Sequence, residues 1–164
     1  PPPTPPPLLP HPSRWTKREK VDIFAMDMLI VSIHCNRNHW TLALVNFDLE
    51  QIEYFDSLGR SPGRVLATLR RYLNDEHMDK KKKVPFAIDH WPDIVHQTTV
   101  ETVRDSTQIP RQCNDYDCGV FVCTNADYLS QGVLLDYTKK DIVCMRRRLA
   151  AQILRAKLFE PYYE

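Results

Sequence analysis

The stretch IPRQCNDYDCG, residues 109–119, is the part of the sequence that decides the interpretation of this chain. It is polar up to Asp117 and is followed by apolar residues at helical spacing, with Gly132 as a natural stop. Cys118 is therefore predicted at or near the start of a helix, where unpaired N–H groups stabilise a thiolate. A free cysteine is otherwise often a small buried hydrophobe.

Upstream, an apolar pattern indicates a small sheet. Three segments predict strands: 27–33, 40–47 and 52–55. The second is almost continuously apolar, as expected of a central strand that is covered on both faces. The short polar link between the second and third strands predicts a hairpin, so the start of one and the end of the other should share an edge. We therefore expect His39 and Asp56 to be neighbours.

These residues suit a thiol hydrolase. His39 could take the proton of the Cys118 thiol and later protonate a leaving amine, while Asp56 holds the imidazole in the required tautomer. The side-chain amide of Gln112, with the backbone N–H of Cys118, could stabilise an oxyanion. Each residue also has an ordinary structural interpretation: a structural histidine, a turn-forming aspartate and a solvated glutamine.

The remaining candidates comprise one aromatic residue with two compatible interpretations and the other histidines and cysteines. Trp40 could form a wall of a substrate channel, although burial on a central strand would also explain it. The four histidines without a comparable strand-end partner stay outside the catalytic hypothesis: His34, His77, His90 and His96. The other four cysteines lack zinc-ligand spacing and are interpreted as core or surface thiols, so we expect neither a metal nor another cofactor: Cys35, Cys113, Cys123 and Cys144.

The helical pattern is clear in two further places. Ser61-Pro62 predicts a helix start, with one apolar stripe over residues 65–73, and the polar residues 74–83 predict a solvated connection. Residues 84–109 carry a weak signal, with a short edge strand near 91–95. Thr138 and Asp141 predict a capping box. The final helix should then bury one face, formed by Ile142, Met145, Leu149, Ile153 and Leu158.

Composition limits the class of protein. The 164 residues suit one domain, and 43% hydrophobic residues are enough for a core. A net charge of +1 gives no reason to expect a nucleic-acid partner, and the basic clusters 80–83 and 146–148 are interpreted as solvated faces. No apolar run is long enough for a membrane helix. The odd cysteine count favours a reducing compartment.

The N-terminus differs from the rest of the chain. Eight of the thirteen prolines fall in residues 1–12, which predicts a disordered tail over residues 1–13 followed by one domain over 14–164. A proline-rich ligand for an SH3 or WW domain is the alternative.

The chain resembles the SUMO/sentrin-specific (Ulp-type) cysteine protease family. The resemblance rests on His39-Trp40, on residues 54–59 (YFDSLG) and on residues 112–119 (QCNDYDCG), and it extends from about Arg14 to Leu158. It implies an α+β fold with a papain-like core, a small central mixed sheet flanked by helices, and the order His39, Asp56, Gln112, Cys118 for base, orienting carboxylate, oxyanion donor and nucleophile. Trp40 would cover the tunnel for a glycine tail.

The resemblance also implies a function. Family members mature SUMO precursors and cleave the isopeptide bond after Gly-Gly, often in the nucleus, so we expect SUMO or SUMO conjugates as partners, a monomer, and a location in the nucleus, at its envelope or in the cytoplasm. The N-terminal part of the family domain has no counterpart before Arg14. Alternatives are therefore a protease for NEDD8 or another ubiquitin-like modifier, a noncatalytic SUMO-binding module, or an acyltransferase.

Overall fold

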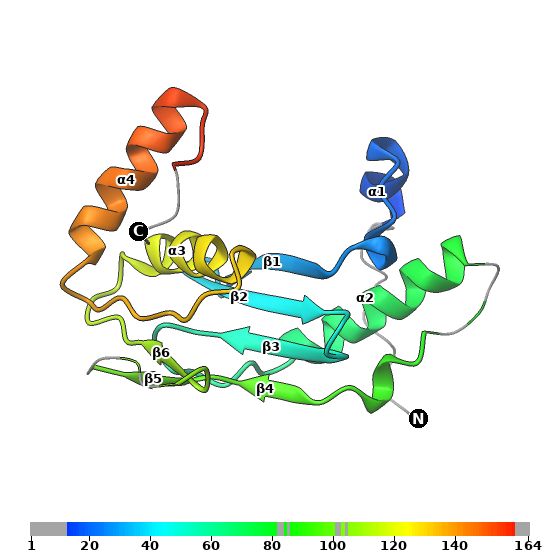
Figure 1. Cartoon of the computed structure of the whole chain (residues 1–164). Helices are drawn as coiled ribbons and strands as arrows, with labels where there is room; N and C mark the ends of the chain where they lie inside the picture. Colours follow the sequence, from blue (N-terminus) through cyan, green and yellow to red (C-terminus); the bar gives the residue numbers. More distant parts are fainter. Residues whose placement is uncertain (1–12, 82–83, 85, 101–102, 104, 160–164) are drawn as a thin grey trace.

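A computed structural model describes residues 13–81, 84, 86–100, 103 and 105–159, and its centre is a four-stranded mixed sheet (Figure 1). The strand order is β1-β2-β3-β4. The strands span Met28–Cys35, His39–Asn46, Gln51–Phe55 and Asp93–Val95, in that order. β1, β2 and β3 are antiparallel neighbours, whereas β4 runs parallel to β3. The expected α+β class with a small mixed sheet is confirmed.

β2 is the central strand, and both of its faces are covered as predicted. On one face, Leu42 and Leu44 pack with side chains of α3 (Cys118–Ser130) and α4 (Ile142–Arg155). On the other face, Ala43 and Val45 pack with side chains of α2 (Val65–Lys80). This alternation follows from the period of two in a strand. The sheet is therefore a middle layer between helices. This arrangement leaves the ends of the strands available for a functional site.

The registers of the β1–β2 and β2–β3 hairpins determine which residues lie side by side at the candidate site. In the first turn, Asn36 and Arg37 adopt positive φ values of 50° and 65°, which suits a tight hairpin without glycine. Leu42 pairs with Phe55 across the second hairpin. His39 at the start of β2 and Asp56 just after β3 therefore lie at the same edge of the sheet, as expected.

The helix α2 differs from the sequence prediction at both ends. It begins at Val65 rather than at Ser61-Pro62, and Gly63 has a φ of 53°, which is not helical. It continues to Lys80, so residues 74–80 are not a solvated connection. The polar C-terminal turns stay helical because Glu76, which is 2% exposed, accepts a hydrogen bond from Thr16 of α1 (Ser13–Glu19). Glu76 also forms an ion pair with Lys80.

Short elements lie before the sheet and between α2 and α3. η1 (Ile23–Ala25) precedes the sheet. Between α2 and α3, η2 (Ile88–His90) leads into β4, the edge strand that the sequence predicted. Two further strands, β5 (Gln97–Thr99) and β6 (Gln108–Pro110), form a separate parallel pair. Their three-residue length explains why the sequence signal was weak.

The final helix α4 differs from the prediction at both ends. Asp141 accepts hydrogen bonds from the Thr138 backbone N–H and hydroxyl, both 2.8 Å, which is one half of the predicted capping box. The other half is missing, because the N-cap of α4 is Asp141, which makes no side-chain capping bond, and the Thr138 hydroxyl accepts from the Lys140 N–H. Ile142 and Met145 are buried, but Ile153 is 79% and Leu158 is 74% exposed, so the prediction of their burial was wrong. The C-terminal half of α4 projects beyond the layer that it would have to contact (Figure 1).

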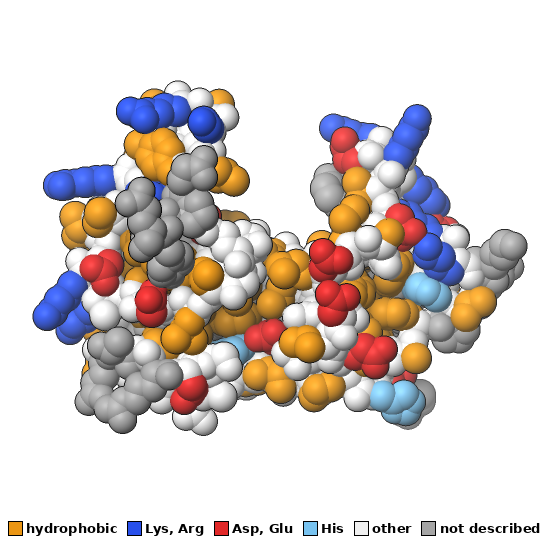
Figure 2. Space-filling view, viewed as in Figure 1, with side chains coloured by type: hydrophobic (Ala, Val, Ile, Leu, Met, Phe, Trp, Pro, Cys, Tyr) orange, Lys and Arg blue, Asp and Glu red, His pale blue; other side chains and the backbone are white. Residues whose placement is uncertain are grey.

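The surface is hollowed between two projecting parts. Figure 2 shows one lobe over α3 and α4 and another over α1 and α2, with apolar side chains gathered in the saddle between them. None of the described helices has the length and apolar character needed to cross a membrane. The predicted disordered tail lies outside the described residues except for Ser13, which begins α1.

Candidate active site

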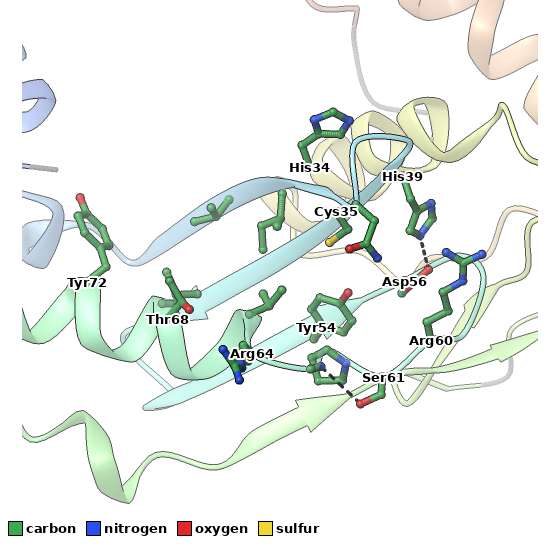
Figure 3. A pocket seen from close by; sticks show the side chains of 17 residues that line it. His34, Cys35, His39, Tyr54, Asp56, Arg60, Ser61, Arg64, Thr68 and Tyr72 are labelled. Atoms are coloured by element: carbon green, nitrogen blue, oxygen red, sulfur yellow. Dashed lines mark hydrogen bonds and ion pairs between the residues drawn. The ribbon is translucent and has the colours of Figure 1, made fainter. Parts of the chain in front are cut away.

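A buried histidine–carboxylate pair lies at the edge of the sheet. The distance between His39 Nε2 and Asp56 Oδ1 is 2.7 Å, and each residue is 3% exposed (Figure 3). Because a carboxylate can only accept, Nε2 carries the proton and Nδ1 is left as the basic nitrogen. The backbone N–H of Leu58 also donates to Asp56 Oδ1 over 2.8 Å, which fixes the carboxylate. The sequence prediction that these residues are neighbours is confirmed.

Cys118 is the first residue of α3, as the sequence indicated. It is 5% exposed, and its helix packs on β2 through Val120 and Phe121. The preceding residue, Asp117, makes no side-chain capping bond to the helix. Cys118 therefore stands at the positive end of the α3 macrodipole, where the first-turn backbone N–H groups have no partner within the helix.

Gln112 connects the loop before Cys118 to the strand end that carries Asp56. Its backbone N–H donates to the carbonyl oxygen of Ser57 over 2.8 Å. In addition, the Ser57 hydroxyl donates to Gln112 Oε1, also over 2.8 Å, and both side chains are buried. These two bonds bring the loop that precedes Cys118 to the residue next to Asp56. Sequence reasoning proposed Gln112 but missed Ser57, although its position directly after Asp56 was a usable signal.

The loop itself is held by side chains. The Asn114 amide donates to Asp117 Oδ2 over 2.6 Å, while Asn114 Oδ1 accepts from the backbone N–H groups of Tyr116 and Asp117. Arg146 of α4 binds the other oxygen of Asp117. The interpretation of Arg146 as part of a solvated face was therefore incomplete. Asp115, within this loop, does not adopt a positive φ.

Trp40 lies beside His39 but is not buried. It is 40% exposed and stacks on His34 of β1, with ring centroids 4.5 Å apart and planes at 18°. The two residues lie opposite each other on β1 and β2, since His34 and Trp40 are register partners. Burial on a central strand does not explain this indole, whereas a wall for a substrate is compatible with its exposure.

A groove of about 660 Å³ begins at the histidine–carboxylate pair and continues along the α2 face of the sheet (Figure 3). Its walls include Ile33 of β1, Tyr54 of β3 and Leu69 of α2. Burial raises the pKa of Tyr54 to about 12, and the negative charge of Asp56 adds to this effect. The Tyr54 hydroxyl is therefore a neutral hydrogen-bonding group at physiological pH.

A second histidine–carboxylate pair joins β4 to β3. His96 Nε2 lies 2.8 Å from Glu53 Oε2, and the His96 ring stacks on Phe55 with centroids 4.1 Å apart. The statement that His96 lacks a comparable partner was wrong. Burial raises the pKa of Glu53, but hydrogen bonds from His96 and Gln51 outweigh this and hold that pKa below its ordinary value. The pair ties the edge strand to the sheet.

The remaining thiols differ from Cys118 in their surroundings. Cys113, Cys123 and Cys144 are exposed and Cys35 is half-buried, and all five cysteines are free. Although Cys123 keeps an exposed surface, desolvation by the atoms around its sulfur raises the pKa of this thiol, so less of it is thiolate at neutral pH than of a free cysteine.

The arrangement of a helix-start cysteine, a histidine at the start of one strand and an aspartate after its neighbour is typical of cysteine peptidases with a papain-like core. The sequence matches the Ulp1 protease family, C-terminal catalytic domain, over residues 6–158, and the chain belongs to this family.

Similar proteins share this assignment. A Sentrin-specific protease of Caenorhabditis elegans is 37% identical over 145 residues, which cover 88% of this chain and 19% of that protein. Ubiquitin-like-specific protease 1 of Saccharomyces cerevisiae is 33% identical over 145 residues, covering 86% of this chain and 21% of that protein. The chain thus spans about a fifth of the length of these curated relatives.

Solved structures agree with the fold. The C-terminal Ulp1 protease domain in complex with Smt3, the yeast orthologue of SUMO, superposes with a TM-score of 0.67 at 31% identity, covering 87% of this chain and 58% of that one. The Ulp1-like SUMO protease catalytic domain of Chaetomium thermophilum gives a TM-score of 0.70 at 29% identity, covering 90% of this chain and 54% of that one.

Proposed function

We propose that this chain is a cysteine protease that cleaves after the Gly-Gly terminus of a SUMO-like modifier, both in precursors and in isopeptide-linked conjugates. The observation that carries the proposal is the buried 2.7 Å bond between His39 and Asp56, in a chain of the Ulp1 family with Cys118 at the start of α3. The SUMO named for the relatives supports the choice of substrate.

The reaction follows from the protonation state of His39. With Nε2–H donated to Asp56, Nδ1 accepts the Cys118 thiol proton, and the thiolate attacks the glycine carbonyl carbon to form an S–C bond. The oxyanion is stabilised by the backbone N–H of Cys118 and by Gln112 Nε2. The imidazolium then protonates the leaving lysine amine as the C–N bond breaks. Water hydrolyses the thioester with His39 acting again as base.

Trp40 supplies the steric part of the proposed selectivity. Glycine has no side chain, so a Gly-Gly tail can pass under an indole that would block larger residues. The exposure of Trp40 beside His39 supports this role, and its stacking on His34 would hold the indole plane in place.

The test uses a SUMO conjugate and a SUMO probe with a C-terminal electrophile. The parent protein should cleave the conjugate and be labelled by the probe, whereas the Cys118→Ser protein should do neither. Cys123→Ser is the matched control, because it removes an exposed thiol from the same helix. Equal cleavage by the parent and the Cys118→Ser protein would remove Cys118 from the mechanism.

Two alternatives give different results in the same experiment. Faster labelling by a NEDD8 probe than by a SUMO probe would reassign the modifier. SUMO binding without turnover, even at high protein concentration, would indicate a noncatalytic binding module. The latter is worth testing because the chain covers only 58% of the solved Ulp1 domain.

The proposal also covers the cellular location and the oligomeric state of the protein. Because family members often act on SUMO conjugates in the nucleus, we propose a location in the nucleus, at its envelope or in the cytoplasm, and action as a monomer. Imaging of the tagged full-length protein and sedimentation of the purified domain would test these two points.

A further inference from the structure

The orientation of the Gln112 side-chain amide is determined by its neighbours. Gln112 Nε2 donates to the main-chain carbonyl oxygen of Asn114 over 2.6 Å, and a carbonyl oxygen can only accept. The nitrogen must therefore point toward the loop that leads to Cys118. The oxygen, Oε1, then points the other way, toward the hydroxyl of Ser57.

Ser57 is the group that holds this oxygen. Its hydroxyl donates to Gln112 Oε1 over 2.8 Å, and each of the two residues is 3% exposed. A buried amide oxygen without a donor is costly, so this bond stabilises the orientation that the Asn114 carbonyl oxygen imposes on the amide. The backbones of the two residues are also joined, by the 2.8 Å bond from Gln112 N–H to the Ser57 carbonyl oxygen.

One hydrogen of the Gln112 amide remains for a substrate. The first is donated to the Asn114 carbonyl oxygen, and Nε2 makes only a longer 3.4 Å contact with Asn114 Oδ1. That oxygen already accepts from the backbone N–H groups of Tyr116, at 3.2 Å, and Asp117, at 3.0 Å. A negatively charged oxyanion is a better acceptor than this shared amide oxygen, and it would attract the second hydrogen.

We infer that Ser57 is a positioning residue that fixes the amide of Gln112 with its nitrogen toward the oxyanion. This inference rests on the proposed function, in which Gln112 is the oxyanion donor. Ser57 does not touch the reacting atoms; it acts through Gln112. Its position directly after Asp56 means that one strand end would orient both the base and the oxyanion donor.

The expected kinetic effect is specific. Without the hydroxyl, Gln112 Oε1 loses its buried donor and the amide is held less firmly in the donating orientation, so Ser57→Ala should lower kcat about tenfold, with little change in KM. Loss of Gln112 itself should cost more, on the order of 10² to 10³ in kcat. In a Gln112→Ala background, Ser57→Ala should have no further effect, because the group that it positions is gone.

Two small probes separate positioning from general damage. Iodoacetamide alkylates Cys118 without forming an oxyanion, so its rate should be the same in the parent and the Ser57→Ala protein. The peptide aldehyde acetyl-Gly-glycinal adds the Cys118 sulfur to its carbonyl carbon, forming a hemithioacetal whose oxygen occupies the oxyanion position. Its affinity should fall about tenfold in the Ser57→Ala protein.

Conservative variants complete the experiment. Ser57→Thr, which keeps a hydroxyl, should recover aldehyde affinity, and Ser130→Ala is the matched control, because Ser130 bonds only locally, to the Asp127 carbonyl oxygen at the end of α3. Equal losses of alkylation and of aldehyde affinity in Ser57→Ala, or multiplicative effects with Gln112→Ala, would overturn the inference. Both probes lack SUMO, so a parent protein that binds the aldehyde but cleaves no SUMO conjugate would contradict the proposed function alone.

Discussion

The edge of the sheet near His39 and the C-terminal half of α4 are opposite in construction. At the sheet edge, polar side chains are 3% exposed and bonded to one another, as in the pairs His39–Asp56 and Ser57–Gln112. On α4, apolar side chains face solvent, with Ile153 79% and Leu154 87% exposed. Buried polar groups are tolerated only when their partners are fixed. The sheet edge near His39 should therefore tolerate few substitutions, and we call it the restrictive edge. The C-terminal half of α4 should tolerate many, and we call it the permissive end.

The largest effect is expected at the restrictive edge. Asp56→Asn should lower kcat on a SUMO substrate by about 10⁴, because an amide no longer enforces the tautomer with a basic Nδ1 on His39. Asp48→Asn, in the exposed β2–β3 turn, is the matched control and should leave kcat unchanged. Steady-state kinetics of the two proteins provide the measurement. A loss of less than about tenfold for Asp56→Asn would show that the carboxylate is not the orienting group.

A large loss of stability is expected where α2 packs on the sheet. Leu73 is 0% exposed within the cluster that includes Val45 and Ile52. Leu73→Ala should lower the free energy of unfolding by about 2 to 5 kcal/mol, through lost burial and the cavity that remains. Urea denaturation followed by circular dichroism measures the change. A decrease below about 1 kcal/mol would mean that this face of the sheet is loosely packed.

Alkaline pH should destabilise the fold through its buried tyrosines. Burial raises the pKa of Tyr54 to about 12 and that of Tyr137 well above its ordinary value. Since a raised pKa favours the protonated folded state, this stability is complete below the ordinary tyrosine pKa of about 10. It is lost as pH rises from there toward the folded-state pKa, because only the unfolded chain releases the proton.

The measurement is the urea midpoint at about pH 9 and at about pH 12, in the parent and in the Tyr54→Phe protein. The midpoint should fall with pH in both, and by less in Tyr54→Phe, which has one fewer buried phenol. An equal fall in both proteins would exclude Tyr54 as a contributor.

The smallest effect is expected at the permissive end of α4. Leu154→Ala should change the free energy of unfolding by less than about 0.5 kcal/mol, because the leucine side chain is already in solvent. It makes the same chemical change as Leu73→Ala in a different environment, so the two measurements form one comparison. A destabilisation near that of Leu73→Ala would show that α4 packs differently in solution.

The sequence predicted the positions of the candidate site residues better than the packing of the helices. The hairpin register and the helix after Cys118 follow from local patterns, which is why His39, Asp56 and Cys118 could be placed in advance. The Ser57–Gln112 bond joins residues far apart in the chain, and no local pattern reports such a contact.

The errors in helix boundaries have similar causes. The end of α2 was missed because Glu76 is stabilised by Thr16, which comes from another helix. Ile153 and Leu158 were assigned to the core because helical periodicity shows which residues share a face, but not whether a neighbouring element extends far enough to cover it.

The order of the strands also has a consequence for how the chain folds. β1, β2 and β3 form a meander of local contacts, so this part can form early, and it already contains both His39 and Asp56. Cys118 arrives only after the chain has crossed over through α2 to the parallel strand β4 and returned to the sheet with α3. We therefore expect a nascent chain to assemble the proposed base, His39, before the proposed nucleophile, Cys118, so that the thiol would meet its partners only late in folding.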